Sequence, residues 1–182
     1  MRELSLHILD IAQNSLSAGA DNIRIVIIED YKQDKLIIKI KDNGCGMDEE
    51  TVKNVVDPFY TTRTTRKVGL GIPMFKQSAE STDGGFKIKS ELGVGTEIDA
   101  EFKISHIDRM PLGNMAETII TVIMADINVN LVYTHTINEN TFTLNTKEIK
   151  KTLGDLPIDN LDVIMWLKGY VQDNLNEMRS QL

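Results

Sequence analysis

The stretch Asp42-Asn-Gly-Cys-Gly-Met47 decides the fold, because it lies where a strand pattern ends and a helix pattern begins. In the preceding segment, KLIIKIKD (35–42), apolar and charged residues alternate, which predicts a strand with Ile38 and Ile40 on its inward face. Asp42 continues that inward face at the end of the strand. A buried carboxylate needs a partner. Either a ligand's amino group or a backbone amide would serve, and the backbone amide is the commoner partner.

Around this stretch, the periodicity of the chain predicts a mixed set of helices and strands. A helix is expected over residues 3–18, with His7, Asp10 and Asn14 on a polar stripe beside its apolar face. Thr96 is the first inward-facing residue of the strand expected at 95–104, and Asp42 is the last inward-facing residue of the strand at 35–42. The other expected elements are strands at 22–28, 85–91 and 95–104, a short helix after residue 47 and a helix from about residue 72.

Charges and histidines in these elements have simple structural interpretations. Lys87 and Lys89 are expected to form cross-strand pairs with acidic residues of strand 95–104. By its position, His7 is expected on the surface of its helix, and His135 in half-buried packing. Cys45, between two glycines, is interpreted as an incidental small residue.

The character of the sequence changes from about residue 105. After a junction at 110–114, the pattern predicts an apolar helix at about 115–126, strands at 129–137 and 141–145, and two further helices, the last from about residue 160. We therefore divide the chain into residues 1–104 and an α+β extension, residues 105–182. The extension is either packing that covers the first part or a module that binds a partner or forms a homodimer.

Glycines and cations predict a phosphate-binding segment. Gly69-Leu-Gly71 precedes a helix, so free backbone N–H groups and the positive end of the helix dipole are available to an anion there. Arg63, Arg66 and Lys67 stand just before it. The segment is not a Walker loop, which needs the pattern GxxxxGK[ST], and no third glycine makes it a dinucleotide fingerprint.

Composition excludes several classes of protein. The chain has 182 residues, 41% of them hydrophobic, and a net charge of −7, which argues against a general nucleic-acid binder. Cys45 is the only cysteine, which excludes a disulfide framework or a cysteine metal site within one chain. The N-terminus is not a secretory signal, and no window approaches the roughly 18 apolar residues of a membrane span. We expect a cytoplasmic protein that contacts neither membrane nor nucleic acid.

The order of the motifs resembles the GHKL ATPase family of gyrase, heat-shock chaperones, histidine kinases and mismatch-repair ATPases. The resemblance covers residues 3–104 and implies the α/β Bergerat fold, a two-layer sandwich with helices on one face of a mixed sheet. The matching motifs are DIAQNSLSAGA (10–20) for the N-box, DNGCGM (42–47) and GLGI (69–72) for two glycine boxes, DPFYTT (57–62) for the F-box and GVGTEI (93–98) for the last box.

This resemblance implies a Mg²⁺-ATP site. Asn14 would coordinate Mg²⁺, Asp42 would accept a hydrogen bond from the adenine amino group, and residues 60–68 would form a lid. The implied nucleotide-binding residues are Asn14, Asp42, Gly44, Gly46, Met47, Thr61, Thr62, Arg63, Lys67, Gly69, Leu70, Gly71 and Thr96.

Asp10 occupies the position where hydrolysing members place a catalytic glutamate, and its carboxylate is shorter by one methylene. The resemblance implies an ATPase or protein kinase with Asp10 as general base, acting on a separate protein through the extension or the lid. The alternative is an ATP-gated binding module with negligible turnover. A DNA-repair enzyme is a third reading, which the acidic composition and the short chain disfavour.

Overall fold

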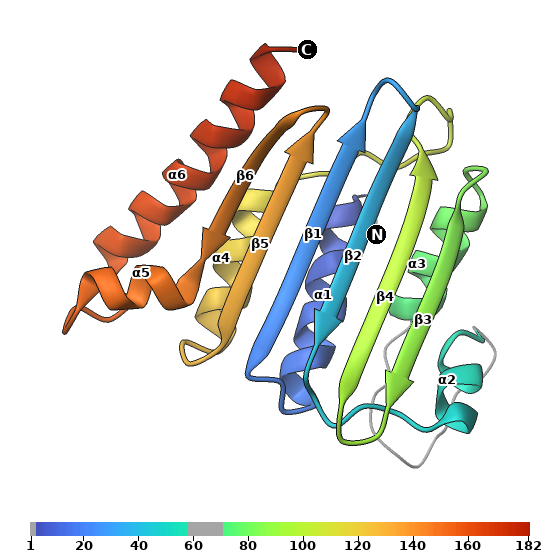
Figure 1. Ribbon diagram of the computed structural model, residues 1–182, viewed down its shortest axis with the longest axis horizontal. Helices are drawn as coiled ribbons and strands as arrows, with labels where there is room; N and C mark the ends of the chain where they lie inside the picture. The colour runs from blue at the N-terminus through green and yellow to red at the C-terminus, as the bar shows by residue number, and fades with distance from the viewer. Residues whose placement is uncertain (1–2, 58–70) are drawn as a thin grey trace.

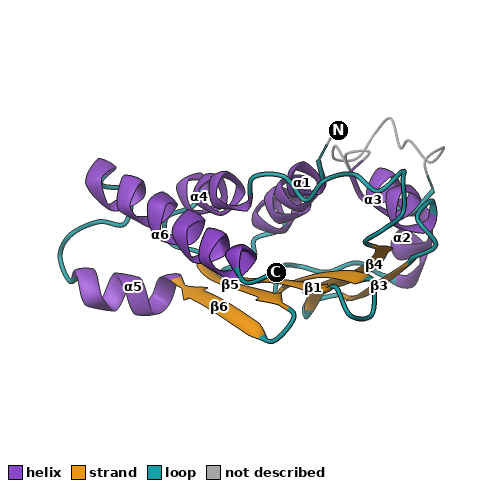
Figure 2. Ribbon diagram, turned by 90° about the horizontal axis from the view of Figure 1, so that it is seen from above, coloured by secondary structure: helices purple, strands orange, loops and turns teal. Residues whose placement is uncertain are grey.

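The computed structural model describes residues 3–57 and 71–182. One six-stranded sheet, in the order β3-β4-β2-β1-β5-β6, forms a layer, and α1, α3 and α4 lie against one of its faces (Figures 1 and 2). The first part of the chain forms α1 (Leu4–Ser17), β1 (Asn22–Asp30), β2 (Lys35–Asp42), α2 (Glu49–Val55), α3 (Gly71–Glu80), β3 (Gly85–Glu91) and β4 (Gly95–Lys103). The rest forms α4 (Met115–Ala125), β5 (Asn130–Ile137), β6 (Asn140–Asn145), α5 (Thr146–Leu153) and α6 (Leu161–Ser180).

The inward faces of the central strands agree with the predicted alternation. Ile38 and Ile40 on β2 are buried under the helices, as are Ile98 and Phe102 on β4. Strands β2 and β4 pair antiparallel. The α/β fold class predicted from the sequence is therefore confirmed.

Strands β5 and β6 continue the same sheet rather than forming a second one. β5 pairs parallel to β1, with Ile25 opposite Tyr133, and β6 pairs antiparallel to β5. The segment before α4 is bonded to the N-terminal end of α1. There, Leu4 N donates to Pro111 O at 3.0 Å and Ser5 N donates to Leu112 O at 2.7 Å. The extension is thus joined to the first part through both the sheet and the helix layer.

This packing predicts that a fragment of residues 1–106 aggregates. Without β5, the hydrogen-bonding edge of β1 is unpaired. Without α4, the apolar side of α1 that contacts α4 in the full chain is exposed to water. Solubility and light scattering of the fragment should be compared with those of the full chain. A fragment that stays monomeric and binds ATP would contradict this expectation and show that the first part folds by itself.

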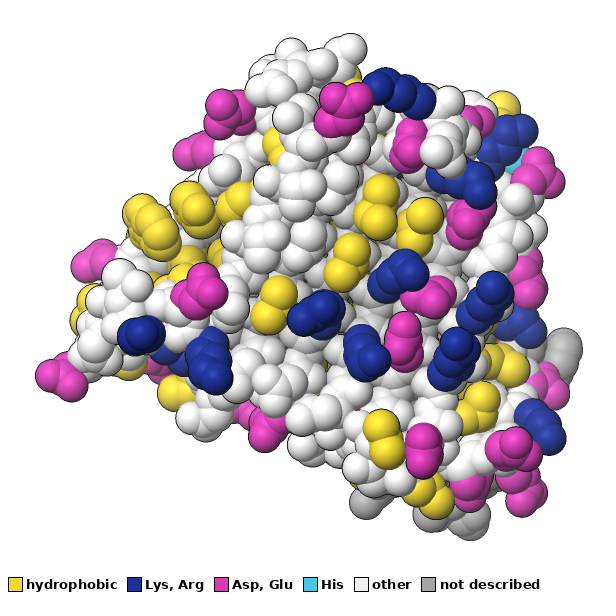
Figure 3. Space-filling view, viewed as in Figure 1, with side chains coloured by type: hydrophobic (Ala, Val, Ile, Leu, Met, Phe, Trp, Pro, Cys, Tyr) yellow, Lys and Arg dark blue, Asp and Glu magenta, His cyan; other side chains and the backbone are white. Residues whose placement is uncertain are grey.

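The expected charge pairs of the sheet form with a different strand. The acidic residues of β4 pair with lysines of β2, not with Lys87 and Lys89 of β3. The pairs are Lys35–Glu101 at 2.8 Å, Lys39–Asp99 at 3.7 Å and Lys41–Glu97 at 3.1 Å. The reason is the position of β4 between β2 and β3, which places lysines opposite its carboxylates on both sides. These charges lie interleaved on the open face of the sheet (Figure 3), where each pair contributes little to stability.

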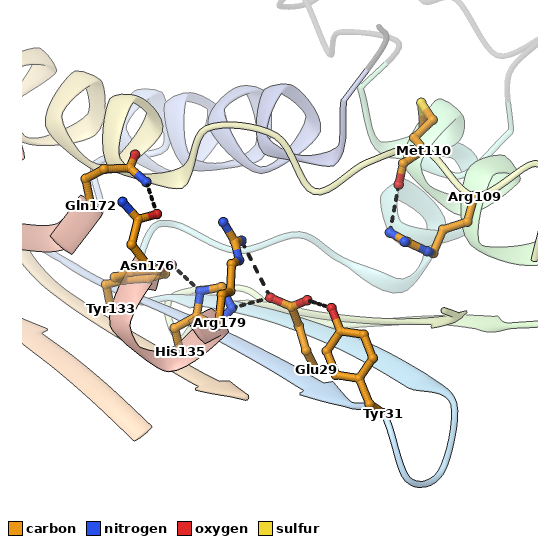
Figure 4. Close-up of polar contacts among 9 residues, drawn as sticks. All are labelled: Glu29, Tyr31, Arg109, Met110, Tyr133, His135, Gln172, Asn176 and Arg179. Atoms are coloured by element: carbon orange, nitrogen blue, oxygen red, sulfur yellow. Dashed lines mark hydrogen bonds and ion pairs between the residues drawn. The ribbon is translucent and has the colours of Figure 1, made fainter. Parts of the chain in front are cut away.

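A buried polar network ties β1, β5 and α6 together (Figure 4). Glu29 Oε1 lies 2.7 Å from His135 Nε2 and 3.8 Å from Arg179 Nη2, while Tyr31 Oη donates to Glu29 Oε2 at 2.9 Å. Tyr133 Oη lies 2.6 Å from His135 Nδ1. The expected half-buried position of His135 is wrong, because α6 packs on β5 and the side chain of His135 is 0% exposed. Polar partners at both ring nitrogens make this burial tolerable.

Burial alone would raise the pKa of the Glu29 carboxyl. The hydrogen bonds from His135 and Tyr31, with the positive charge of Arg179, outweigh burial and hold this pKa below its usual value. The ionised Glu29 carboxylate therefore stabilises the folded protein relative to the unfolded chain.

Candidate nucleotide-binding site

A pocket of about 330 Å³ opens between α1, the ends of β2 and β4, and the loop that leads into α2. That volume is within the range of small-molecule sites. Five of the predicted nucleotide-binding residues lie together in its wall: Asn14, Asp42, Gly46, Met47 and Thr96. The other lining residues are Ile11, Ser15, Ser17, Ala18, Ile40, Cys45, Thr51, Val55, Ile72 and Ile98.

Asp42 is held rigidly at the floor of this pocket. Its Oδ1 accepts hydrogen bonds from Gly44 N at 2.9 Å and Thr96 N at 3.2 Å, and Ser15 Oγ donates to its Oδ2 at 2.5 Å. The register of the sheet sets Asp42 directly opposite Thr96. Backbone amides are thus partners of this carboxylate, as the commoner interpretation of the sequence expected, and the carboxylate also faces the pocket.

The glycine loop after β2 is held from two sides. Cys45 N donates to Ala18 O at 2.9 Å, at the end of α1, and Gly93 N donates to Cys45 O at 2.8 Å. Gly46 has a φ of +67°, and a Cβ there would lie 1.9 Å from Glu91 O. Only glycine fits this position, because the loop passes directly over the end of β3.

Two serines that the sequence analysis did not single out hold residues of the pocket in place. Ser15 is buried on α1 and donates to Asp42. Ser90 Oγ accepts from Met47 N at 2.8 Å and lies 2.9 Å from Thr96 Oγ1. Helical spacing from Ile11 and Ile8 marks Ser15 as inward-facing, a signal that could have found it. Strand alternation gives a comparable signal for Ser90, which shares the inward face of β3 with Phe86 and Ile88 and lies opposite Thr96.

Asp10 and His7 do not line the pocket; they lie on α1 where it meets Gly71, the first residue of α3. Asp10 Oδ2 is buried and has no hydrogen-bond partner among the described residues; a Cβ on Gly71 would lie 1.6 Å from it. Burial raises the pKa of the Asp10 carboxyl. Gly71 must therefore lack a side chain for α3 to begin beside this carboxylate.

The expected surface position of His7 is wrong. Its side chain is 1% exposed and stacks on Phe75 of α3, with ring centroids 5.6 Å apart. Burial lowers the pKa of His7, and a hydrogen bond with the Gly71 backbone only partly opposes this. The physical reason is that α3 packs across the polar stripe of α1, so the stripe faces another helix instead of water.

The remaining predicted residues divide into two groups. Gly44 is buried but does not line the pocket, and a Cβ at this position would lie only 3.0 Å from Ala18 Cβ, which is a tight contact. Thr61, Thr62, Arg63, Lys67, Gly69 and Leu70, with the expected lid at 60–68, lie outside the described residues.

The family model described as "Histidine kinase-, DNA gyrase B-, and HSP90-like ATPase" matches residues 2–106, more than half of the chain. The chain belongs to this family. The pocket lies within the matched residues, and the predicted GHKL membership is confirmed.

Relatives of this chain include sporulation kinase E of Bacillus subtilis, 36% identical over 89 residues, which are 48% of this chain and 12% of that protein. Another is the histidine-protein kinase AtoS of Escherichia coli, 33% identical over 95 residues, 52% of this chain and 15% of that protein. The matched part of the chain thus spans less than a fifth of the length of these two relatives.

The fold is shared with the ATPase domain of Aquifex aeolicus MutL, solved with ADP, at a TM-score of 0.52 and 14% identity. That alignment covers 93% of this chain and 88% of the MutL domain. The chain therefore contains a histidine-kinase-like ATPase domain with the Bergerat fold. None of the helices in the described part of the chain is long and apolar enough to cross a bilayer.

Proposed function

We propose that this domain binds Mg²⁺-ATP, or ADP, with the adenine ring in the pocket that Asp42 closes. The observation that carries the proposal is the hydrogen bonding of that carboxylate. A carboxylate offers about four lone-pair positions. Gly44 N, Thr96 N and Ser15 Oγ use three of them, which leaves one on Oδ2 for a donor in the pocket. An exocyclic amino group is such a donor, and the apolar walls suit a purine ring.

Asn14 is proposed as the protein ligand of Mg²⁺. Its side chain lines the pocket one helical turn after Asp10, and an amide oxygen suits a hard cation. Within the described ranges there is no group of three His, Cys, Asp or Glu side chains that could hold a metal by itself. A single amide ligand fits an ion that takes most of its other ligands from phosphates and water.

The phosphates are proposed to lie toward Gly71, at the N-terminal end of α3, with Thr61, Thr62, Arg63, Lys67, Gly69 and Leu70 as further contacts. Asp10 is proposed as the general base for phosphoryl transfer. Its buried Oδ2 is free to accept a proton within the described structure, and its raised pKa brings it closer to the range that suits a base at neutral pH. The acceptor would be water or a side chain of a separate protein in the cytoplasm.

The alternative function is an ATP-gated binding module with negligible turnover. The observation that favours it is the short reach of Asp10, whose carboxylate is already fixed against Gly71. In that case binding of nucleotide changes the affinity for a partner, and the chemistry is slow or absent.

Adenine specificity tests the proposed orientation. ATP should bind at least about tenfold more tightly than GTP. The keto group of guanine is a hydrogen-bond acceptor, so it would face the Asp42 carboxylate without donating to it. The unpaired carboxylate would cost about 1–3 kcal/mol of binding free energy. Asp42→Asn should reduce the affinity for ATP, measured by calorimetry, whereas Asp108→Asn on an exposed loop should not. Equal affinity for ATP and GTP would refute the adenine assignment.

The metal assignment has its own test. Asn14→Ala should remove most of the gain in ATP affinity that Mg²⁺ gives, because the amide oxygen is lost while the adenine contacts remain. Titrations with and without Mg²⁺ measure that gain, and Gln13→Ala, on the exposed side of the same helix, is the matched control. An unchanged Mg²⁺ effect in Asn14→Ala would assign the metal to other ligands.

A further inference from the structure

Ser90 lies on β3, directly behind the wall of the nucleotide pocket. Its Oγ is within hydrogen-bond distance of three groups: Met47 N at 2.8 Å, Gly95 O at 2.9 Å and Thr96 Oγ1 at 2.9 Å. Met47 and Thr96 line the pocket, whereas Ser90 does not. Ser90 therefore acts on a bound ligand only through these neighbours.

The number of hydrogens decides the direction of each of these bonds. A serine hydroxyl has one hydrogen to donate and two lone pairs that accept. The backbone amide of Met47 can only donate and the carbonyl of Gly95 can only accept, so the hydrogen of Ser90 goes to Gly95 O. The contact with Thr96 then needs the hydrogen of Thr96 Oγ1. This is the only assignment that satisfies all three contacts.

The direction of the last bond fixes what Thr96 presents to the pocket. Because its hydroxyl hydrogen points to Ser90, Thr96 Oγ1 offers only lone pairs to a ligand. Asp42, which lies opposite Thr96 in the sheet, is also an acceptor, and the hydroxyl of Ser15 already donates to Asp42 Oδ2. Together, Ser15, Asp42 and Thr96 offer lone pairs to the pocket and no free hydrogen.

We propose that Ser90 is a positioning residue that makes the pocket specific for a purine with an amino group, by holding the Thr96 hydroxyl as an acceptor. This inference rests on the proposed adenine site. An amino group has two hydrogens, one for Asp42 and one for Thr96 or for a water between them. A keto group has none, and it finds no donor here while the hydrogen of Thr96 is held by Ser90. Ser90 thus adds to the discrimination that Asp42 provides.

The ratio of the affinities for ATP and inosine triphosphate measures this role. Inosine carries a keto group at position 6 of the purine, where adenosine carries the amino group. Ser90→Ala removes the acceptor of the Thr96 hydroxyl, which can then turn and donate to the keto group, directly or through a water. The ratio, measured by calorimetry, should fall by about fivefold, the value of one neutral hydrogen bond. Any loosening of the loop at Met47 affects both nucleotides and cancels in the ratio.

Further variants separate this role from a merely structural one. Ser90→Thr retains the hydroxyl and should restore the native ratio. In a Thr96→Val background no hydroxyl remains to be oriented, so Ser90→Ala should leave the ratio of that background unchanged. Ser180→Ala is the matched control, because Ser180 also donates to a backbone carbonyl but lies exposed at the end of α6. Ser90→Cys keeps nearly the same shape with weaker hydrogen bonds and should lower the ratio, which preserves the test if the alanine variant does not fold.

The outcomes distinguish this inference from the proposed function. If the native chain does not bind ATP, or binds ATP and inosine triphosphate equally, the adenine site is refuted and the inference falls with it. If the native chain prefers ATP but Ser90→Ala and Ser90→Cys keep the full ratio, only the role of Ser90 is overturned. A change of the ratio by Ser90→Ala in the Thr96→Val background would overturn it as well, because the effect would not pass through Thr96.

Discussion

Replacement of Asp10 by asparagine is expected to lower the rate of ATP turnover, or of phosphoryl transfer, by about 10²- to 10⁴-fold, the usual contribution of a general base. The affinity for ATP should stay nearly unchanged, because the base contacts the nucleophile and not the bound phosphates. Single-turnover measurements with γ-labelled ATP, with release of phosphate and labelling of added proteins both followed, separate the rate from the affinity.

Asp99→Asn, on the outward face of β4, is the matched control and should not alter turnover. If the native protein and Asp10→Asn are equally inactive with every acceptor tried, the assignment of Asp10 as a base fails, and the ATP-gated module remains. Asp10→Glu adds a second comparison. Since Asp10 Oδ2 already lies against Gly71, a longer side chain must move α3 or turn toward the nucleotide, and an increased rate would show that the native carboxylate keeps the chemistry slow.

Loss of the Glu29 carboxylate is expected to give the largest change in stability. Glu29→Ala leaves the buried ring of His135 and the hydroxyl of Tyr31 without their acceptor inside the protein, and a buried group left unsatisfied costs about 1–3 kcal/mol. For a chain of this size the thermal midpoint should fall by roughly 2–12 °C. Glu80→Ala, on the exposed side of α3, should change it little. A change of less than about 2 °C in Glu29→Ala would show that the network contributes only packing.

The same carboxylate predicts the direction of a pH effect. The pKa of Glu29 is lower in the folded protein than in the unfolded chain, so its stabilisation is present above the unfolded value of about 4.3. As the pH falls from there through the folded pKa, this stabilisation is lost. Urea unfolding of the native chain and of Glu29→Gln should therefore converge toward low pH. Parallel curves for the two proteins would contradict this assignment.

The sequence predicted those parts of the site that follow from local periodicity. The inward positions of Asp42 and Thr96 came from the alternation of two separate strands, and the sheet sets these residues directly opposite each other. Gly46 was recognised as a glycine of the loop, and its positive φ and contact with Glu91 explain why the loop needs it. These features depend on few residues close together in the chain, so pattern alone could find them.

The features that the sequence missed depend on packing between distant segments. His7 was expected on the surface because its own helix gives no sign that α3 covers it through Phe75. His135 was expected to be half-buried because the covering by α6 and the partner Glu29 come from other parts of the chain. Strand alternation places Ser90 on an inward face, and only the structure shows that it bonds Met47 and Thr96, two residues that line the pocket.

The parallel pairing of β1 with β5 has a consequence for the time course of folding. Asn22 on β1 is paired with Asn130 on β5, so at synthesis rates of about 5–20 residues per second the first strand waits roughly 5–20 s for its neighbour. Pairings between such distant segments also slow refolding of the full chain, because the intervening loop must be closed before they form. During this interval the apolar edge of β1 is available to other chains. Dilute conditions should therefore increase the yield of native protein, whereas slow translation lengthens the interval in which β1 is exposed.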